Sequence, residues 1–400
     1  MQLNSDRLER IRPWMQGYVN ARKYPGCATL IAQGGKEVFY HDCGLRDVEN
    51  GVPWSRDTVA RIYSMTKPIT SLALMMLVER GLVHLDAPLS AFIPGFAEAR
   101  CLVPGAATLD QVEPCLPPTL HQLLTHTAGV SYSFNPGLVP AAMGEGKLDF
   151  GPGKRSLAEA AEAIAGLPLV FRPGSRWEYS VGIDLIGRVI EVVSGRSFGD
   201  FLVAEIFEPL GMAETRFTVL EGAKDRFANL YTPLSGDAMD LNAISKSEET
   251  LRLADGAADS PYHRTVMHSG GGGLVGTIDD YAKFADMLRA GGKGIVSPAT
   301  LDFMMRNHLP GDIASMGPQS FAEQPMEGMG FGIGGAVVLD PGRARVPGSV
   351  GDFSWGGMAS TFFWLDRQND LTAIFFTQLS PSSSYPSRSQ LKALVQGALM

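Results

Sequence analysis

The hydrophobic and polar positions near both ends of the chain follow patterns typical of a sheet and its covering helices. Residues 5–22 repeat apolar side chains at helical spacing, which predicts an amphipathic helix. The runs 27–32 and 36–40 flank Gly34-Gly35, and this arrangement predicts a β-hairpin. At the other end, β-rich runs at 360–366 and 371–378 precede a short apolar-periodic segment that predicts a closing helix.

The middle of the chain has a different pattern. The stretch from Thr66 to Gly81 is apolar on all sides at helical spacing, which is typical of a buried helix that stops at a glycine. Helical segments then alternate with loops rich in Pro and Gly, with one clear helix over 183–193. Residues 133–153 are expected to form a mobile loop. Thr277 and Asp280 are spaced like a capping box before another helix.

These patterns predict an α+β fold in which strands from both ends of the chain form one antiparallel sheet. The terminal helices would flank the sheet, and a mainly helical insertion would pack beside it. We therefore expect a discontinuous sheet domain made of residues 1–65 and 266–400 and a helical domain made of 66–265. A cleft between them is the natural place for a site.

Composition narrows the classes of function. The 400 residues include 34 Lys and Arg against 42 Asp and Glu, a net charge of −8 without a basic run, so a nucleic-acid partner is not expected. We also expect no membrane partner, because no stretch of about 18 apolar residues occurs. The N-terminus lacks a signal-peptide pattern, and the four cysteines show no zinc spacing, which indicates free thiols and a cytoplasmic location. A Cys101–Cys115 disulfide is a less favoured alternative.

The strongest chemical motif is Ser64-Met65-Thr66-Lys67, an S-x-x-K at the start of the buried helix. Residues three apart share one helix face, so Lys67 can reach the Ser64 hydroxyl. Burial against an apolar helix would disfavour a charged ammonium and let Lys67 accept a proton. The bare pattern is common by chance, and it would then be only a helix cap followed by a solvated lysine. The apolar helix around Lys67 favours the catalytic interpretation.

Two further segments could complete such a site. Tyr179, in the segment WEYSVG, could act as a proton shuttle, and Tyr132 competes with it for that role. Either tyrosine alone could equally be structural. The run from Ser354 to Met358 contains Trp355-Gly356-Gly357 just before a β-rich run, and its glycines would let the backbone approach a ligand. It could equally be an ordinary turn.

Other motifs are weaker. The run Gly195–Gly199 fits the G-x-S-x-G elbow of α/β-hydrolases, but a helix precedes it where the elbow needs a strand, so Ser197 is interpreted as a helix start. His268-Ser269-Gly270 could imitate a K-T-G strand motif, but it runs into further glycines and is interpreted as a loop. The seven histidines show no metal-ligand spacing, and the glycine run 270–273 lacks a phosphate-loop lysine. No metal or cofactor is therefore expected.

Taken together, several segments resemble the serine β-lactamase-like superfamily, and most closely the family VIII carboxylesterases, which are similar to class C β-lactamases. The matching segments follow one another in family order over nearly the whole chain: IYSMTKPITSLALM, TLHQLLTHTAGVSY, PLVFRPGSRWEYSVGIDLIGRVIEVVSG, IFEPLGMAETRF, GGGLVGTIDDYAKFADML and FSWGGMASTFFWLD. The resemblance implies a β-lactamase/penicillin-binding-protein-like fold and the activity of a serine carboxylesterase.

Residue by residue, the resemblance implies Ser64 as nucleophile, Lys67 as its base partner and Tyr179 as a second base or acid. The backbone N–H groups of Ser64 and Met358 would form the oxyanion hole. Trp355, Gly356, Gly357 and, less directly, Tyr132 would contact the substrate, a small-molecule ester.

Two departures from the β-lactamase pattern favour ester substrates. Val181 stands where β-lactamases carry the Asn of the tyrosine motif, and Trp355 replaces the lysine of K-T-G. Both changes remove polar groups that would hold a β-lactam, and a Trp favours an uncharged, apolar substrate portion. We therefore expect hydrolysis of small or short-acyl esters through a Ser64 acyl-enzyme. Weak β-lactamase or peptidase activity, acyl transfer to an alcohol and non-catalytic acyl binding stay open as alternatives.

Overall fold

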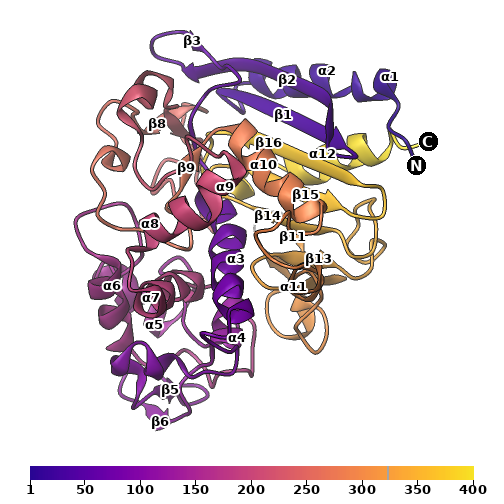
Figure 1. Cartoon of the computed structure of the whole chain (residues 1–400). Helices are drawn as coiled ribbons and strands as arrows, with labels where there is room; N and C mark the ends of the chain where they lie inside the picture. The colour runs from indigo at the N-terminus through magenta and orange to yellow at the C-terminus, as the bar shows by residue number, and fades with distance from the viewer. Residues whose placement is uncertain (322–323) are drawn as a thin grey trace.

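A large antiparallel sheet forms the centre of the molecule (Figure 1), as seen in a computed structural model that describes residues 1–321 and 324–400. It has eight strands, all joined to their neighbours in antiparallel register. In spatial order the strands are β12 (Met329–Phe331), β13 (Ala336–Val338), β14 (Phe353–Gly356), β15 (Phe362–Asp366), β16 (Leu371–Thr377), β1 (Gly26–Gln33), β2 (Lys36–Asp47) and β3 (Val52–Pro53).

The two ends of the chain meet in the middle of this sheet. β1 pairs with β2 on one side and with β16 on the other, so that Thr29 lies opposite both His41 and Phe375. Alternate side chains of β1 and β16 enter opposite cores, because successive strand residues point to opposite faces. Burial on both faces explains why the runs 27–32 and 371–378 are largely apolar.

Helices cover both faces of the sheet (Figure 1). One face packs against α1 (Ser5–Leu8), α2 (Ile11–Asn20) and α12 (Ser387–Gln396), which share a core with Phe375. The other face packs against α10 (Ile278–Arg289) and α3 (Thr66–Glu79), where Tyr281 and Phe284 meet Phe376 and Phe363. The sheet therefore lies between two helical layers, one of which contains the terminal helices that the sequence predicts to flank it.

The remaining elements lie mostly beside α3. The helices are α4 (Leu120–Leu124), α5 (Leu138–Glu145), α6 (Leu157–Ala165), α7 (Gly182–Ser194), α8 (Phe198–Leu202), α9 (Glu208–Leu210) and α11 (Pro298–Met304). The short strands pair as β4 (Ala60–Arg61) with β9 (Val275–Gly276), β5 (Arg100–Leu102) with β6 (Val112–Pro114), β7 (Leu230–Thr232) with β8 (Arg252–Asp255), and β10 (Ser320–Phe321) with β11 (Gln324–Pro325). α7 packs on α3, α4 and α6 and carries the apolar stripe expected for 183–193.

Most sequence-based elements are confirmed, with two corrections. The helix predicted over 5–22 is broken into α1 and α2 around Glu9 and Arg10. The predicted mobile loop 133–153 contains the helix α5, whose Val139 and Met143 are buried in the main core. The helix α5 was not predicted because it is short, and its apolar face is stabilised by packing against the core, which a local sequence pattern does not reveal. The strands of the large sheet fall in 26–53 and 329–377, while the predicted domain boundaries stay a prediction.

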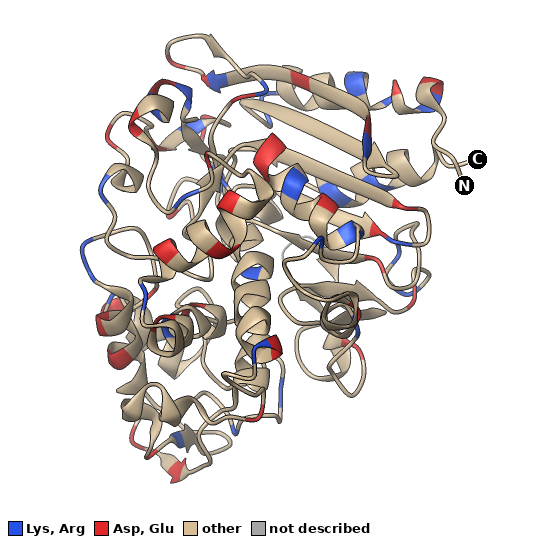
Figure 2. Ribbon diagram, viewed as in Figure 1, with Lys and Arg blue, Asp and Glu red and all other residues tan. Residues whose placement is uncertain are grey.

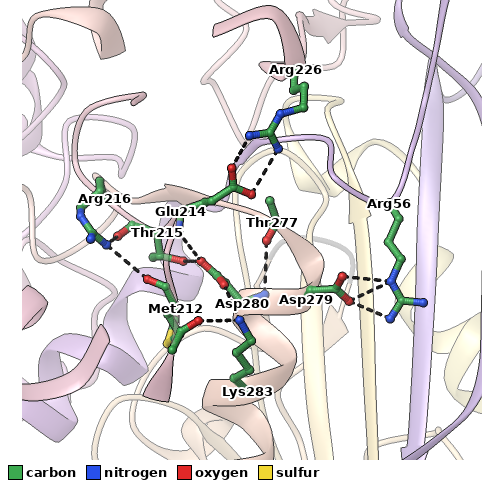
Figure 3. Close-up of polar contacts among 11 residues, drawn as sticks. Arg56, Met212, Glu214, Thr215, Arg216, Arg226, Thr277, Asp279, Asp280 and Lys283 are labelled. Carbon is green, nitrogen blue, oxygen red and sulfur yellow. Dashed lines mark hydrogen bonds and ion pairs between the residues drawn. The ribbon is translucent and has the colours of Figure 1, made fainter. Parts of the chain in front are cut away.

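The start of α10 joins the sheet layer to the segment that follows α9 (Figure 3). The Thr277 hydroxyl accepts the Asp280 N–H, which is one of the two hydrogen bonds of the predicted capping box. The Asp280 carboxylate accepts hydrogen bonds from the Glu214 N–H at 2.8 Å and the Thr215 hydroxyl at 3.0 Å. Glu214 in turn pairs with Arg226. This network holds the start of α10, which packs on the sheet, against the segment that follows α9.

Charged residues occur mainly outside the central strands (Figure 2). Lys, Arg, Asp and Glu are dispersed over the peripheral helices and loops with both signs mixed, while the central strands carry few. Among the described residues, no helix combines the length and the apolar character that a membrane crossing requires.

Candidate active site

Ser64 lies in a tight 3₁₀ turn, Tyr63–Met65, directly before α3 rather than inside the helix. Tyr63 precedes it with a φ of +43°, a left-handed conformation that non-glycine residues seldom adopt. Such strain persists where the surroundings enforce it, and it often marks functional sites. The turn presents the Ser64 side chain, which is partly exposed, at the N-terminal end of a buried helix.

Lys67 is fully buried on the first turn of α3, as the apolar pattern predicts. Its ammonium donates to three oxygens: the Gly271 carbonyl at 2.7 Å, the Tyr132 hydroxyl at 2.9 Å and Ser64 Oγ at 3.3 Å. The spacing of three residues therefore brings Lys67 onto the serine. A buried amine with three partners is held in one geometry, which a solvated lysine would not be.

Behind Lys67, Tyr132 and Asp184 form a buried polar network. The Tyr132 hydroxyl lies 3.4 Å from a carboxylate oxygen of Asp184, whose other oxygen accepts the Gly271 N–H and the Ser269 hydroxyl. Burial raises the pKa of Tyr132 well above its ordinary value, and the nearby Asp184 charge adds to this effect. Burial also raises the pKa of Asp184, while Lys67 acts in the opposite direction. Tyr132 is thus held as a neutral phenol that accepts from Lys67.

Tyr179 approaches Ser64 from the opposite side. Its hydroxyl donates to Ser64 Oγ at 2.7 Å, and its ring centroid lies 4.5 Å from the Lys67 ammonium. Of the two tyrosines that the sequence left in competition, Tyr179 is the one whose hydroxyl contacts the serine. Tyr132 contacts Lys67 instead and is not among the residues that line the adjoining pocket. The role of Tyr132 in substrate binding stays a prediction.

Trp355 and Gly356 end strand β14, and Gly357 follows directly in the connection to β15, so the segment precedes a β-rich run as predicted and is a strand end rather than an ordinary turn. A Cβ at Gly357 would lie 2.2 Å from the Ile62 carbonyl oxygen, so only glycine permits this approach to the turn that carries Ser64. Met358 follows at the same pocket wall as Ser64. In the described part of the chain, the backbone N–H groups of Ser64 and Met358 donate to no protein acceptor. They are therefore available to an incoming oxyanion.

A pocket of about 500 Å³ opens in front of Ser64. Its wall includes Tyr179, Trp355 and Phe321, whose rings lie close together: Tyr179 to Phe321 at 4.7 Å, Tyr179 to Trp355 at 5.5 Å, and Phe321 stacked on Trp355 at 6.1 Å. We call these three rings the aromatic wall. Phe321 comes from the short hairpin β10–β11 and was not found from the sequence, because a two-residue strand carries no periodic signal.

The two competing motifs have structural roles. Ser197 caps α8 by accepting the Asp200 N–H, and Gly195 ends α7 in a left-handed conformation, so no strand leads into a nucleophile elbow. His268 accepts the Gly199 N–H and stacks on Phe217. The loop interpretation of 268–270 is confirmed, but Ser269 also supports Asp184 behind Lys67, a connection that the sequence did not reveal.

Comparison with known proteins shows to which family the chain belongs. The model of the family described as Beta-lactamase matches residues 11–397. The chain belongs to this family. Esterase EstB of Burkholderia gladioli is 32% identical over 367 residues, which cover 89% of this chain and 86% of EstB. Lovastatin esterase of Penicillium rubens is 30% identical, with 87% of this chain and 86% of the esterase covered.

Solved structures agree with this assignment. EstCE1, described as a hydrolase with promiscuous acyltransferase activity, superposes with a TM-score of 0.81 at 27% identity and 98% coverage of both chains. Both the predicted β-lactamase/penicillin-binding-protein-like fold and the resemblance to family VIII esterases are confirmed. The family assignment supports serine hydrolase chemistry, and the roles of individual residues follow as proposals.

Proposed function

We propose that this protein hydrolyses carboxylic esters through an acyl-enzyme on Ser64. The observation that carries the proposal is the position of Ser64 Oγ, which contacts both the Tyr179 hydroxyl at 2.7 Å and the Lys67 ammonium at 3.3 Å at the wall of a pocket. Relatives named as esterases at 30–32% identity support the same reaction. A small-molecule ester would be the substrate.

Acylation would begin with attack of Ser64 Oγ on the ester carbonyl carbon. The serine proton would pass to Lys67 in its neutral amine form, directly or through the Tyr179 hydroxyl, because both groups lie within hydrogen-bonding distance of Ser64 Oγ. The carbonyl oxygen would become an oxyanion facing the N–H groups of Ser64 and Met358, and one such donor is typically worth about 3 kcal/mol in the transition state. The C–O bond to the alcohol would then break, and the alcohol would leave with the proton from this pair.

Deacylation would repeat these steps with water as the nucleophile. Water would give its proton to the same pair as it attacks the acyl carbon, and the pair would return that proton to Ser64 Oγ as the acyl bond breaks and the carboxylic acid leaves. The aromatic wall offers apolar surface to the acyl group or the alcohol, which favours uncharged substrate portions.

The experiment that tests the proposal combines labelling with turnover. We expect a fluorophosphonate probe to add one mass equivalent that peptide mapping places on Ser64, together with hydrolysis of p-nitrophenyl butyrate. Ser64→Ala should abolish both with the fold intact by circular dichroism, while Ser197→Ala, a matched control at a helix cap, should retain both. Ester turnover that persists in Ser64→Ala would overturn the assignment.

Acyl transfer is the second candidate, because EstCE1 is described as a hydrolase with promiscuous acyltransferase activity. The same acyl-enzyme would be intercepted by an alcohol in place of water. Adding a short alcohol to p-nitrophenyl butyrate and measuring the ester product against free butyrate separates the two outcomes. A chromogenic cephalosporin in the same series tests for residual β-lactamase activity. A cytoplasmic location stays a prediction.

A further inference from the structure

His126 is a buried histidine directly behind Tyr179. It follows the short helix α4 and has a left-handed backbone, with a φ of +58°. Its side chain is 1% exposed and is surrounded by the rings of Tyr179, Phe331 and Trp177, at centroid distances of 4.8, 5.2 and 5.8 Å. A buried imidazole in an aromatic cage needs a specific polar partner to be retained there.

That partner is the backbone on either side of Tyr179. The Glu178 N–H donates to the His126 carbonyl at 2.9 Å, and the Ser180 N–H donates to His126 Nδ1 at 3.3 Å. The Ser180 hydroxyl also lies 3.1 Å from Nδ1. The His126 ring and carbonyl therefore hold the residues immediately before and after Tyr179, while its ring supports the phenol itself.

The group that donates to the His126 ring determines which of its two nitrogens carries the hydrogen. A backbone N–H can only donate, so Nδ1 must be the unprotonated nitrogen and Nε2 carries the hydrogen. Nε2 is buried and has no hydrogen-bond partner within the described residues. Burial holds the pKa of His126 well below its ordinary value, and the charge of Lys67 acts in the same direction. The ring is thus a fixed acceptor rather than a group that exchanges protons during turnover.

We propose that His126 is a positioning residue for Tyr179: by accepting the Ser180 N–H at Nδ1, it keeps the Tyr179 hydroxyl on Ser64 Oγ. This inference rests on the proposed function. It does not place His126 in contact with the substrate, and it predicts a defect in the chemical step rather than in substrate binding. The 2.7 Å contact between Tyr179 and Ser64 is the geometry at stake.

Two substitutions separate the acceptor from the ring. In His126→Asn, the side-chain oxygen can take the place of Nδ1, and Asn tolerates a positive φ. In His126→Phe, the ring remains but the acceptor is lost. We expect His126→Phe to lower kcat for p-nitrophenyl butyrate about 100-fold with little change in KM, since a displacement of about 1 Å can cost that much. We expect His126→Asn to recover kcat to within about fivefold of wild type, because one neutral hydrogen bond is retained.

Three measurements accompany the kinetics. Circular dichroism and thermal unfolding check the fold, and His126→Ala replaces the Phe variant if that variant does not fold. Ser180→Ala removes the hydroxyl but leaves the N–H donor, so kcat should stay within about threefold of wild type. The rate of fluorophosphonate labelling at Ser64 should fall in parallel with kcat in the Phe variant.

The outcomes distinguish this inference from the function on which it rests. Absence of Ser64 labelling in the wild-type protein would overturn the proposed function itself. Normal wild-type labelling combined with full kcat in a folded His126→Phe or His126→Ala variant would overturn only the positioning role. An Asn variant as defective as the Phe variant would also overturn it, because the ring and not the acceptor would then matter.

Discussion

The two sides of Ser64 are built in opposite ways. Behind it, Lys67, Tyr132, Asp184, Ser269 and Gly271 form a buried network in which the lysine has three oxygen partners. In front of it, the aromatic wall of Tyr179, Trp355 and Phe321 makes ring contacts, and the Tyr179 hydroxyl joins this wall to the serine by a hydrogen bond.

Because of this difference, we expect the network behind Ser64 to determine the rate of the chemical step and the aromatic wall to determine which substrates bind. A buried network with paired groups holds one geometry, and removing a member leaves a polar group unsatisfied in a low dielectric. An apolar wall accepts many shapes, since apolar contacts carry little directional preference. Changes behind Ser64 should therefore act on kcat, and changes at the outer part of the wall should act on KM and substrate range.

The largest effect is expected from Lys67→Met, which keeps the length of the side chain but removes its charge. The Gly271 carbonyl and the Tyr132 hydroxyl lose their donor, and the Ser64 proton loses one acceptor. We expect kcat for p-nitrophenyl butyrate to fall about 10³-fold or more, in the upper range for general acid–base groups. Lys224→Met, at an exposed ion pair with Glu221, is the matched control and should leave kcat unchanged. A Lys67→Met variant within tenfold of wild type would contradict the network's role.

The next effect is expected at Gly357, where the wall meets the nucleophile turn. In Gly357→Ala the new methyl group would press on the Ile62 carbonyl and push β14 and the Met358 amide away from Ser64. We expect kcat to fall about 100-fold, as for loss of one oxyanion donor. Gly222→Ala meets no atom within 4 Å and controls for the substitution itself. Equal kcat values in the two variants would show that the Met358 amide is not needed.

The two tyrosines provide a direct comparison across the serine. Tyr179→Phe removes the hydroxyl on Ser64, and Tyr132→Phe removes one of three partners of Lys67. We expect a loss in kcat of about 100-fold for Tyr179→Phe and about tenfold for Tyr132→Phe, since Lys67 keeps the Gly271 carbonyl. Initial rates and Ser64 labelling rates measure both. A reversed order would make Tyr132 the proton-transfer group.

The sequence predicted the features that depend on residues close together along the chain. Ser64 and Lys67 lie on one side of a helix start, and the two strands of the hairpin β1–β2 flank Gly34-Gly35 directly, so both features were found from local patterns. The other two partners of Lys67 were not assigned to it in this way, because Tyr132 is 65 residues away and Gly271 is 204 residues away. Residue types alone cannot indicate which distant carbonyl meets a buried lysine. Phe321 and α5 were missed for a related reason, since their short segments gain order only from tertiary contacts.

The smallest effect is expected from Phe321→Ala, at the outer part of the aromatic wall. Phe321 contacts Tyr179 and Trp355, whereas the polar contacts of Ser64 Oγ come from Tyr179 and Lys67, so the chemical step should be preserved. Truncation removes apolar surface worth about 1–2 kcal/mol when fully covered, which predicts a rise in KM for p-nitrophenyl butyrate of about fivefold at nearly constant kcat. The enlarged pocket should at the same time raise the relative kcat/KM for p-nitrophenyl octanoate. Leu116→Ala, at a side chain that is 82% exposed, is the control. A fall in kcat as large as that of Tyr179→Phe would show that the wall positions the phenol rather than the substrate, and the separation between the two sides of Ser64 would no longer hold.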